Sequence, residues 1–488
     1  MLFNSLRFLI FFPIVTTAFF LLPCRWRWLL LLSASCFFYM AFIPVYILIL
    51  AFIIVADYVA GIAIERAQGP RRTHYLWLGL AANIGVLFIF KYFNFFNENM
   101  DALARLIHWN YPLGALNIIL PLGLSFQTFK AMSYTFEVYY GRIAAERHLG
   151  IYALYVMFYP QLIAGPIERP YDLLPQLHAE QQVDWGRIGR GLQLMLWGFF
   201  QKIVIADRLS AMVDQVYNHP GTYTGLPVLL ATYAFAFQIY CDFSGYSDIA
   251  IGAGQVMGFN LMANFDRPYF SQSISEFWRR WHISLSSWFR DYLFQPITFL
   301  KRNWGNWGVT CALTITFLAT GLWHGANWTY VIWGGIHGMC IVLGLWLTDV
   351  RRAAVAALKL NHFPSLLRLL NVFITFHIVC FSWIFFRADS LQDAFTLIRC
   401  LPGGWAAPLG TPPWHWIFYL GLTRWDVLIS VAALLILLGA HLDQGPGSLR
   451  QRLSAQPVWL RWPLYYAGIA TVISFSTITR KTFVYFQF

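Results

Sequence analysis

One histidine stands in a glycine- and tryptophan-rich string, Gly321-Leu-Trp-His-Gly-Ala-Asn-Trp328, that closes an apolar run. Gly321 and Gly325 are four residues apart, and small residues at this spacing let membrane helices approach closely. Histidine exchanges protons near neutral pH without carrying a permanent charge into apolar surroundings. We therefore expect other helices to enclose His324, where either general-base catalysis or a structural hydrogen bond would suit it.

Two further histidines compete for a chemical role. His337 lies in the middle of the next apolar run, in which Gly334 and Gly338 repeat the four-residue spacing. His282 lies within the polar and aromatic stretch 273–294. Composition alone favours a packed His282 over a catalytic one.

The stretch 273–294 has the pattern of an amphipathic helix. Its apolar residues recur at helical spacing, at Ile274, Phe277, Trp278, Trp281, Leu285, Trp288, Phe289 and Tyr292. Its charged residues lie largely on the other face, at Arg279, Arg280, Arg290 and Asp291. Basic amphipathic helices lie in the plane of the membrane interface, so we expect this one along the cytoplasmic surface, with His282 on the shoulder of its apolar stripe.

A third polar stretch, Tyr240-Cys-Asp-Phe-Ser-Gly-Tyr-Ser-Asp248, separates two apolar runs. It holds Asp242, Ser244, Tyr246, Ser247 and Asp248. Glycine and serine suit a break in a helix, which is tolerated at membrane depth only where protein or water covers the backbone. Ionisable residues in such a place mark a site or pathway. An ordinary hairpin at the interface is the alternative.

The composition sets the environment of these residues. The chain has 488 residues, of which 58% are hydrophobic and 11% are charged, whereas about 25% are charged in soluble domains. The sequence therefore predicts an all-α, polytopic integral membrane protein with one membrane-embedded domain over 1–488. The net charge of +12 comes from loops between apolar runs, which favours membrane topology over nucleic-acid binding. The seven cysteines are widely spaced and predict neither a disulfide framework nor a metal site.

The apolar runs are long enough for many membrane spans, each of which needs about 20 residues. The candidates are 5–22, 28–44, 46–64, 75–93, 114–139, 150–167, 190–206, 226–241, 246–260, 308–323, 328–347, 368–386, 425–441 and 463–478. We expect about eleven to thirteen true crossings, with the remainder re-entrant or interfacial. The first run lacks a small-residue cleavage site, so we expect a retained helix.

The early loops carry a charge bias that predicts the orientation. The loops after the first, third and fifth spans are basic, with Arg25, Arg27, Arg66, Arg71, Arg72, Arg142, Arg147 and His148. The loop after the fourth span, 94–112, is slightly acidic. Basic loops face the cytoplasm, so we expect the N-terminus and the 94–112 loop outside and the 141–149 loop inside.

These strings together resemble the membrane-bound O-acyltransferase family over nearly the whole chain. The resemblance rests on the strings 246–248, 275–282, 289–292 and, above all, 321–325. The string 160–166 and the closing Tyr-Phe-Gln-Phe are similar to the bacterial branch that acetylates polysaccharides, and most to its alginate-acetylating members. The string 295–302 departs from the glycine-rich turn usual in those members, which leaves the polymer open.

The resemblance implies a function and a site. It places the family's buried catalytic histidine at His324 and its second position, which is a histidine or an asparagine, at His282. It implies acetyl-coenzyme A as acyl-donor substrate, with no permanently bound cofactor and no metal. The implied setting is the bacterial inner membrane and its lipid, with a polysaccharide biosynthesis complex and an extracytoplasmic acetyltransferase as protein partners, and with no nucleic acid.

Other functions stay open at this point. The acyl acceptor could be cellulose, peptidoglycan or teichoic acid in place of alginate. A transporter or flippase would also use polar breaks and glycine-rich helix contacts, but it would not consume acetyl-coenzyme A. A non-catalytic subunit of an export complex would keep full polymer acetylation after loss of His324.

Overall fold

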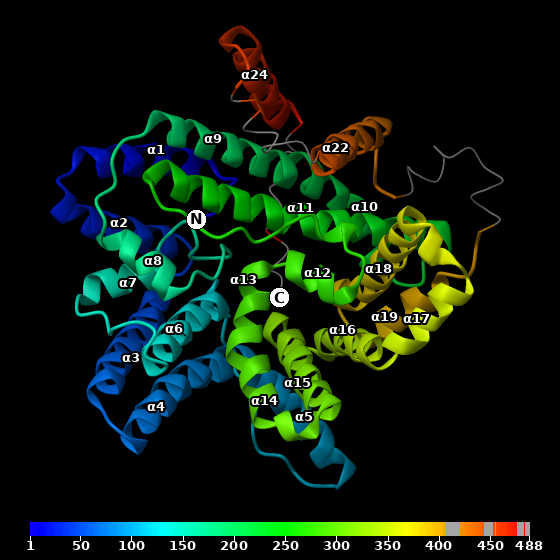
Figure 1. Cartoon of the computed structure of the whole chain (residues 1–488), viewed down its shortest axis with the longest axis horizontal. Coiled ribbons are helices and arrows are strands. Elements are labelled where there is room, and N and C mark those ends of the chain that lie inside the picture. The colour runs from blue at the N-terminus through cyan, green and yellow to red at the C-terminus, as the bar shows by residue number, and fades with distance from the viewer. Residues whose placement is uncertain (406–419, 444–451, 454, 476–482, 484–488) are drawn as a thin grey trace. The chain divides into compact units, whose positions relative to one another are not determined.

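The computed structural model describes residues 1–405, 420–443, 452, 453, 455–475 and 483. Every regular element in these residues is a helix (Figure 1), which confirms the predicted all-α class. Six helical stretches are long and apolar enough to cross a membrane: Pro44–Arg66, Pro70–Leu106, Leu226–Met257, Trp328–Trp346, Pro364–Arg387 and Arg424–Leu442. The chain is therefore a multi-pass membrane protein, and the larger predicted number of crossings stays a prediction.

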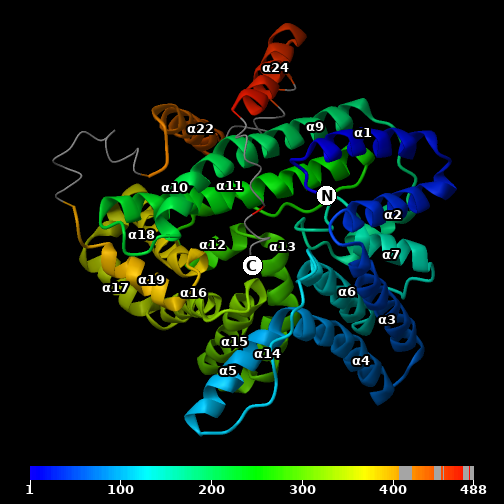
Figure 2. The same ribbon diagram turned by 180° about the vertical axis from the view of Figure 1, so that it is seen from behind.

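Contacts between residues divide the chain into two compact units, 1–195 with 246–262, and 196–245 with 263–488. The first unit contains α1 (Leu6–Leu21), α2 (Cys24–Met40), η1 (Pro44–Tyr46), α3 (Ile47–Arg66), α4 (Pro70–Leu87), η2 (Phe88–Tyr92), α5 (Phe93–Leu106), α6 (Leu124–Tyr139), α7 (Leu149–Met157), α8 (Pro170–His178), most of α9 (Trp185–Phe199) and the end of α11 (Leu226–Met257). Helices α3, α4 and α6 pack against one another, as both views show (Figures 1 and 2).

Two boundaries in this unit differ from the prediction. The helix that begins at Pro70 continues through η2 and α5 to Leu106, so most of the predicted 94–112 loop is helical. The predicted span 114–139 is helical only from Leu124 onward. Apolar composition marks a segment for burial or lipid contact, but it does not fix where a helix starts.

The predicted span 150–167 is also wrong, because α7 ends at Met157 and a buried irregular segment follows. Lys130 explains how the helix can end there. Its ammonium group donates hydrogen bonds to the carbonyl oxygens of Tyr155 (2.5 Å) and Val156 (3.3 Å), and to Oε1 of Gln161 (2.9 Å). Carbonyl groups at a helix end need such partners when they are buried, so the lysine stabilises the turn that opens the 160–166 string.

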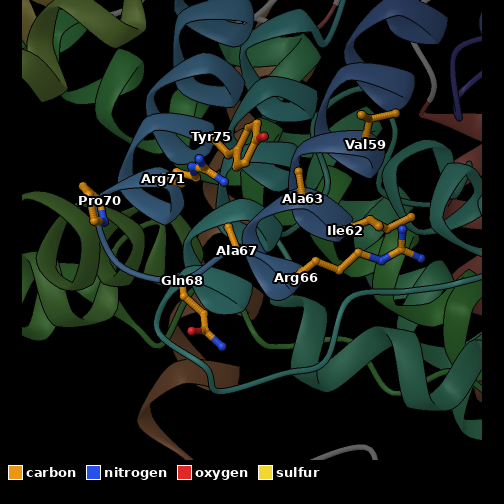
Figure 3. Close-up of a pocket in the computed structure, with 9 residues that line it drawn as sticks. All are labelled: Val59, Ile62, Ala63, Arg66, Ala67, Gln68, Pro70, Arg71 and Tyr75. Carbon is orange, nitrogen blue, oxygen red and sulfur yellow. The ribbon is translucent and has the colours of Figure 1, made fainter.

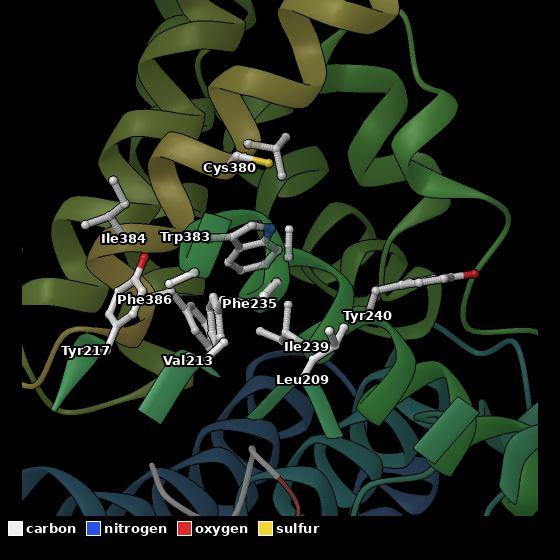
Figure 4. Close-up of a cluster of buried hydrophobic side chains, with 14 of the residues drawn as sticks. Leu209, Val213, Tyr217, Phe235, Ile239, Tyr240, Cys380, Trp383, Ile384 and Phe386 are labelled. Atoms are coloured by element: carbon white, nitrogen blue, oxygen red, sulfur yellow. The ribbon is translucent and has the colours of Figure 1, made fainter. Parts of the chain in front are cut away.

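The second unit contains the end of α9, η3 (Phe200–Ala206), α10 (Asp207–Tyr217), the start of α11, η4 (Pro268–Phe270), α12 (Ile274–Arg280), α13 (Ile283–Phe289), η5 (Arg290–Phe294), α14 (Gln295–Leu300), η6 (Arg302–Trp304), α15 (Asn306–His324), α16 (Trp328–Trp346), α17 (Thr348–Ala357), η7 (Leu360–His362), α18 (Pro364–Arg387), α19 (Leu391–Cys400), α22 (Arg424–Leu442) and α24 (Val458–Ser474). Its core joins α10, α11 and α18 around Trp383 and Phe235 (Figure 4). The closing string 485–488 lies outside the described residues.

The predicted break at 240–248 is wrong, since α11 runs without interruption from Leu226 to Met257. Two features of the second unit explain its continuity. The carboxylate of Asp242 is paired with Lys202, so the charge does not require a water-filled gap. Gly245 lies against the backbone of α9, where an added Cβ would be 2.6 Å from the carbonyl oxygen of Gly198. The polar stretch thus marks a close crossing of two helices and not a hairpin.

Candidate active site

His324 is the last residue of α15, beside the tight turn into α16. The two helices pack closely because their glycines face each other: a Cβ added at Gly334 would lie 3.1 Å from the Cα of Gly321. A Cβ added at Gly321 would overlap the carbonyl oxygen of Tyr330, and one added at Gly334 would overlap that of Phe317. This confirms the predicted role of the glycine pairs. Asn327 closes the turn by accepting a hydrogen bond from the backbone N–H of Thr329 (3.0 Å).

The side chain of His324 is 4% exposed, so the predicted enclosure of this residue is confirmed. Three aromatic rings surround its imidazole nearly edge to face, with centroid distances of 5.0 Å to Trp323, 5.0 Å to Trp333 and 5.3 Å to Phe386. These rings come from α15, α16 and α18. Positive charge is favoured at the carbonyl end of a helix, which suits a histidine that accepts a proton during a reaction.

The predicted amphipathic helix over 273–294 is only partly correct. Its apolar stripe is buried and Arg279 and Arg290 are exposed, as predicted. The helix is interrupted, however, between α12 and α13, and the stretch ends in the π-helix η5. His282 lies in the interruption with a left-handed φ of 44°, so it is not on the shoulder of a helical stripe.

A short preceding segment accounts for this interruption. The backbone N–H of Asp266 donates to the carbonyl of Arg280 (2.9 Å), and that of Ile283 donates to the carbonyl of Asn264 (2.9 Å). These hydrogen bonds replace those that a continuous helix would make. A non-glycine residue at positive φ is uncommon and persists only where surrounding contacts hold its backbone in place. The hydrogen bonds from the preceding segment therefore fix the position of His282.

Asn264 holds the ring of His282 and fixes its tautomer. The backbone N–H of Ser284 donates to Oδ1 of Asn264 (3.2 Å), which identifies this atom as the amide oxygen. Nδ1 of His282 lies 3.1 Å from the same oxygen and must therefore donate to it. A neutral imidazole protonated at Nδ1 has its lone pair on Nε2. Burial lowers the pKa of His282 to about 3, so this ring is neutral at physiological pH.

The two histidines predicted for the site are brought together around one indole. The ring of Trp323 is 6.1 Å from that of His282 and 5.0 Å from that of His324. The ring of Phe243 also packs against His282, edge to face, with 4.6 Å between the ring centroids. One buried region, lined largely by aromatic rings, thus contains the neutral imidazole of His282 and the imidazole of His324 at the end of α15.

His337 is buried and, like His324, contacts the ring of Trp333, but it has a structural hydrogen bond. Its Nε2 is 2.9 Å from the hydroxyl of Ser382 on α18, and that hydroxyl donates its proton to the carbonyl oxygen of Val379 (2.7 Å). The serine oxygen can therefore only accept, and Nε2 of His337 must donate. This hydrogen bond links α16 to α18, which favours a structural interpretation for His337.

Sequence reasoning missed two features of this unit. It did not identify Asn264, whose only signal is a polar residue between apolar stretches. It identified Asp242 but not its partner Lys202, which also binds Asp207 at 2.8 Å. A lysine inside the apolar run 190–206 was the available signal, since intramembrane charges pair with one another. Within the described residues, no group of three His, Cys, Asp or Glu side chains is placed to hold a metal ion.

The contact between Asn264 and His282 gives a testable prediction. Replacing Asn264 by Ala removes the nearer acceptor for Nδ1 of His282 and leaves the hydroxyl of Ser284 at 3.4 Å as a weaker one, so the buried donor loses about 1–3 kcal/mol. We expect acyl transfer to fall about tenfold or more, by the same free energy. Asn264→Asp should retain part of the rate because it keeps the acceptor. Its negative charge should raise the pKa of His282, so the acid limb of the pH–rate profile should move to higher pH.

The measurement is the pH–rate profile of each variant at equal protein level, with Asn260→Ala as control because that side chain is exposed. If Asn264→Asp lost activity equally at all pH values, His282 would not take part through its Nδ1 contact.

Comparison with known proteins places the site within one family. Residues 147–387 match MBOAT, the membrane-bound O-acyltransferase family. The chain is 41% identical over 411 residues to the "Probable alginate O-acetylase AlgI" of Pseudomonas aeruginosa, which covers 82% of this chain and 75% of that protein. It is 32% identical to the "Peptidoglycan O-acetyltransferase" of Helicobacter pylori, with 83% and 80% covered, and 31% identical to the "Teichoic acid D-alanyltransferase" of Streptococcus thermophilus, with 56% and 69% covered.

Proposed function

The chain belongs to the membrane-bound O-acyltransferase family. We propose that it passes an acetyl group from cytoplasmic acetyl-coenzyme A to an extracytoplasmic polysaccharide, and that this polysaccharide is alginate. The chain is an O-acyltransferase and a multi-pass membrane protein. We place it in the bacterial inner membrane, where a cytoplasmic donor and an external acceptor can reach one protein. The several relatives named for alginate acetylation support this acceptor.

The observation that carries the proposal is the burial of His324 at the end of α15. Its ring and that of His282 both contact the indole of Trp323. A buried imidazole in an aromatic wall suits acyl transfer, because exclusion of water protects a thioester from hydrolysis. A transporter has no need for such a base. The structural engagement of His337 further favours His324 for this role.

The proposed chemistry is general-base catalysis at His324. The imidazole takes the proton of an acceptor hydroxyl as the hydroxyl oxygen attacks the carbonyl carbon of the acetyl thioester. The carbon–sulfur bond then breaks, and the imidazolium returns the proton to the departing sulfur. The products are an acetyl ester and coenzyme A with a free thiol. His282, neutral and held by Asn264, would position the thioester or the proton path.

We further propose that a separate extracytoplasmic protein receives the acetyl group, on a serine, and completes polymer acetylation. A polysaccharide needs an extended groove with many polar contacts. The stretch 94–112, which the charge bias predicts to lie outside, is mostly the helix α5. Residues 107–120, which follow α5, are mostly exposed and rich in apolar side chains, and they supply few polar groups for a sugar chain.

The experiment that tests this function uses the purified chain with acetyl-labelled coenzyme A. We expect the chain to bind acetyl-coenzyme A, and to release free coenzyme A thiol and acetylate polymer only slowly until the partner is added, because the thiol leaves as an acceptor hydroxyl takes the acetyl group. Two results would contradict the proposal that a partner protein receives the acetyl group. One is consumption of acetyl-coenzyme A with polymer acetylation that does not depend on the partner, and the other is efficient polymer acetylation by the chain alone. A complete failure to consume acetyl-coenzyme A with the partner present would contradict the proposed donor and favour a transporter or an export subunit.

A further inference from the structure

A pocket lies at the turn between α3 and α4, within the first unit (Figure 3), and none of the residues that line it belongs to the candidate active site. Its volume is about 810 Å³. Its lining divides by chemistry: Val59, Ile62, Ala63, Ala67, Pro70 and the ring of Tyr75 are apolar, whereas Arg66, Gln68 and Arg71 are polar. The guanidinium of Arg71 lies beside Tyr75 between the two helices (Figure 3).

The two arginines of this pocket bring positive charge to its lining. Within the described residues, neither Arg66 nor Arg71 forms an ion pair with a carboxylate. Glu65 is adjacent in sequence, but its carboxylate is paired with Arg147 and accepts the backbone N–H of Ala145 (2.9 Å). The two guanidinium groups point to different sides of the pocket: that of Arg71 lies beside Tyr75, and that of Arg66 extends past Ile62 (Figure 3). The pocket lining therefore offers positive charge and a neutral amide to an anion.

The position of this turn relative to a bilayer follows from its two helices. The stretches Pro44–Arg66 and Pro70–Leu106 are both long and apolar enough to span a membrane. The short link between them must then lie where the hydrocarbon ends and water begins. Val59, one turn or more before that link, is 57% exposed and faces outward from the unit, so the apolar wall of the pocket continues into the lipid region.

We propose that this pocket binds an anionic phospholipid, with its phosphate at Arg66 and an acyl chain along Val59 and Ile62 of the same helix (Figure 3). The charge of Arg71, on the side of Tyr75, adds to the attraction for the headgroup. Basic pockets between membrane helices are suited to anionic headgroups, and arginine pairs with phosphate through parallel hydrogen bonds. The apolar wall favours a lipid over free phosphate, because only a lipid has an acyl chain that can gain binding free energy from contact with this wall. The site is separate from acyl transfer and does not depend on the proposed acceptor.

The test titrates the purified full chain in detergent with phosphatidylglycerol, phosphatidylcholine or inorganic phosphate, and counts bound molecules by native mass spectrometry. We expect phosphatidylglycerol to bind much more tightly than phosphatidylcholine. The double variant R66Q/R71Q should weaken it about 30-fold, because each arginine near an anionic headgroup contributes about fivefold. The control R351Q/R352Q removes the same charge from exposed positions of α17 and should change nothing.

A second variant, V59W, keeps both arginines and places an indole in the apolar part of the pocket. It should also weaken phosphatidylglycerol binding, whereas simple attraction between charges would be unaffected. The proposal would be overturned if R66Q/R71Q bound phosphatidylglycerol like the unmodified chain, if R351Q/R352Q caused an equal loss, or if inorganic phosphate displaced the lipid at equal concentration.

Discussion

Replacing Lys202 by Met should lower the free energy of unfolding by about 3–5 kcal/mol, the usual result of removing one partner from a buried ion pair. The lysine bridges η3 to the carboxylates of Asp207 (2.8 Å) and Asp242 on α11. All three side chains are buried. Without the ammonium group, two carboxylates would remain together in an environment that solvates them poorly, and the continuity of α11 would lose its support.

Thermal unfolding of the purified protein in detergent measures this effect. The matched control is Lys359→Met, which removes the same charge from an exposed position. The double variant K202M/D242N should be more stable than K202M alone, because it leaves one fewer buried carboxylate that has lost its lysine partner. Equal midpoints for K202M and the control would show that the buried ion group does not stabilise this fold.

Replacing His324 by Gln should reduce the rate of acyl transfer by about 10²- to 10⁴-fold, the usual contribution of a general base. Glutamine approximates the size of the imidazole and can occupy the space among Trp323, Trp333 and Phe386. It cannot accept a proton near neutral pH. The expected loss is therefore chemical, and the protein should accumulate and unfold as the unmodified chain does.

The rate of thiol release from acetyl-coenzyme A in membranes, with the acceptor present, measures this loss. His362→Gln is the control, because His362 is an exposed histidine on η7. A rate for His324→Gln within a few-fold of the control would mean that another group is the base.

The features that sequence predicted well are those set by short-range spacing. The four-residue glycine pairs at Gly321 and Gly334 correctly indicated close packing of α15 with α16. The position of His324 at the end of that run correctly indicated its burial. The apolar stripe of 273–294 correctly indicated which side chains are buried, because a helical period largely survives a local interruption.

The features that sequence did not predict depend on partners far along the chain. Whether 240–248 breaks a helix depends on Lys202, which neutralises Asp242 from another helix. Whether 273–294 is continuous depends on Asn264, which takes the backbone and ring hydrogen bonds around His282. The end of α7 depends on Lys130 in the same way. A polar residue in an apolar run shows that it needs a partner, but not which residue supplies it.

The most direct test of the account compares polymer O-acetylation in cells that carry His324→Ala with cells that carry His337→Gln, each at normal protein level. His337 hydrogen bonds as a donor to Ser382, and a glutamine amide can donate in its place. We predict that His324→Ala brings polymer acetylation to background, whereas His337→Gln keeps most of it. Full acetylation with His324→Ala would contradict the assignment of the catalytic base and, with it, the proposed site.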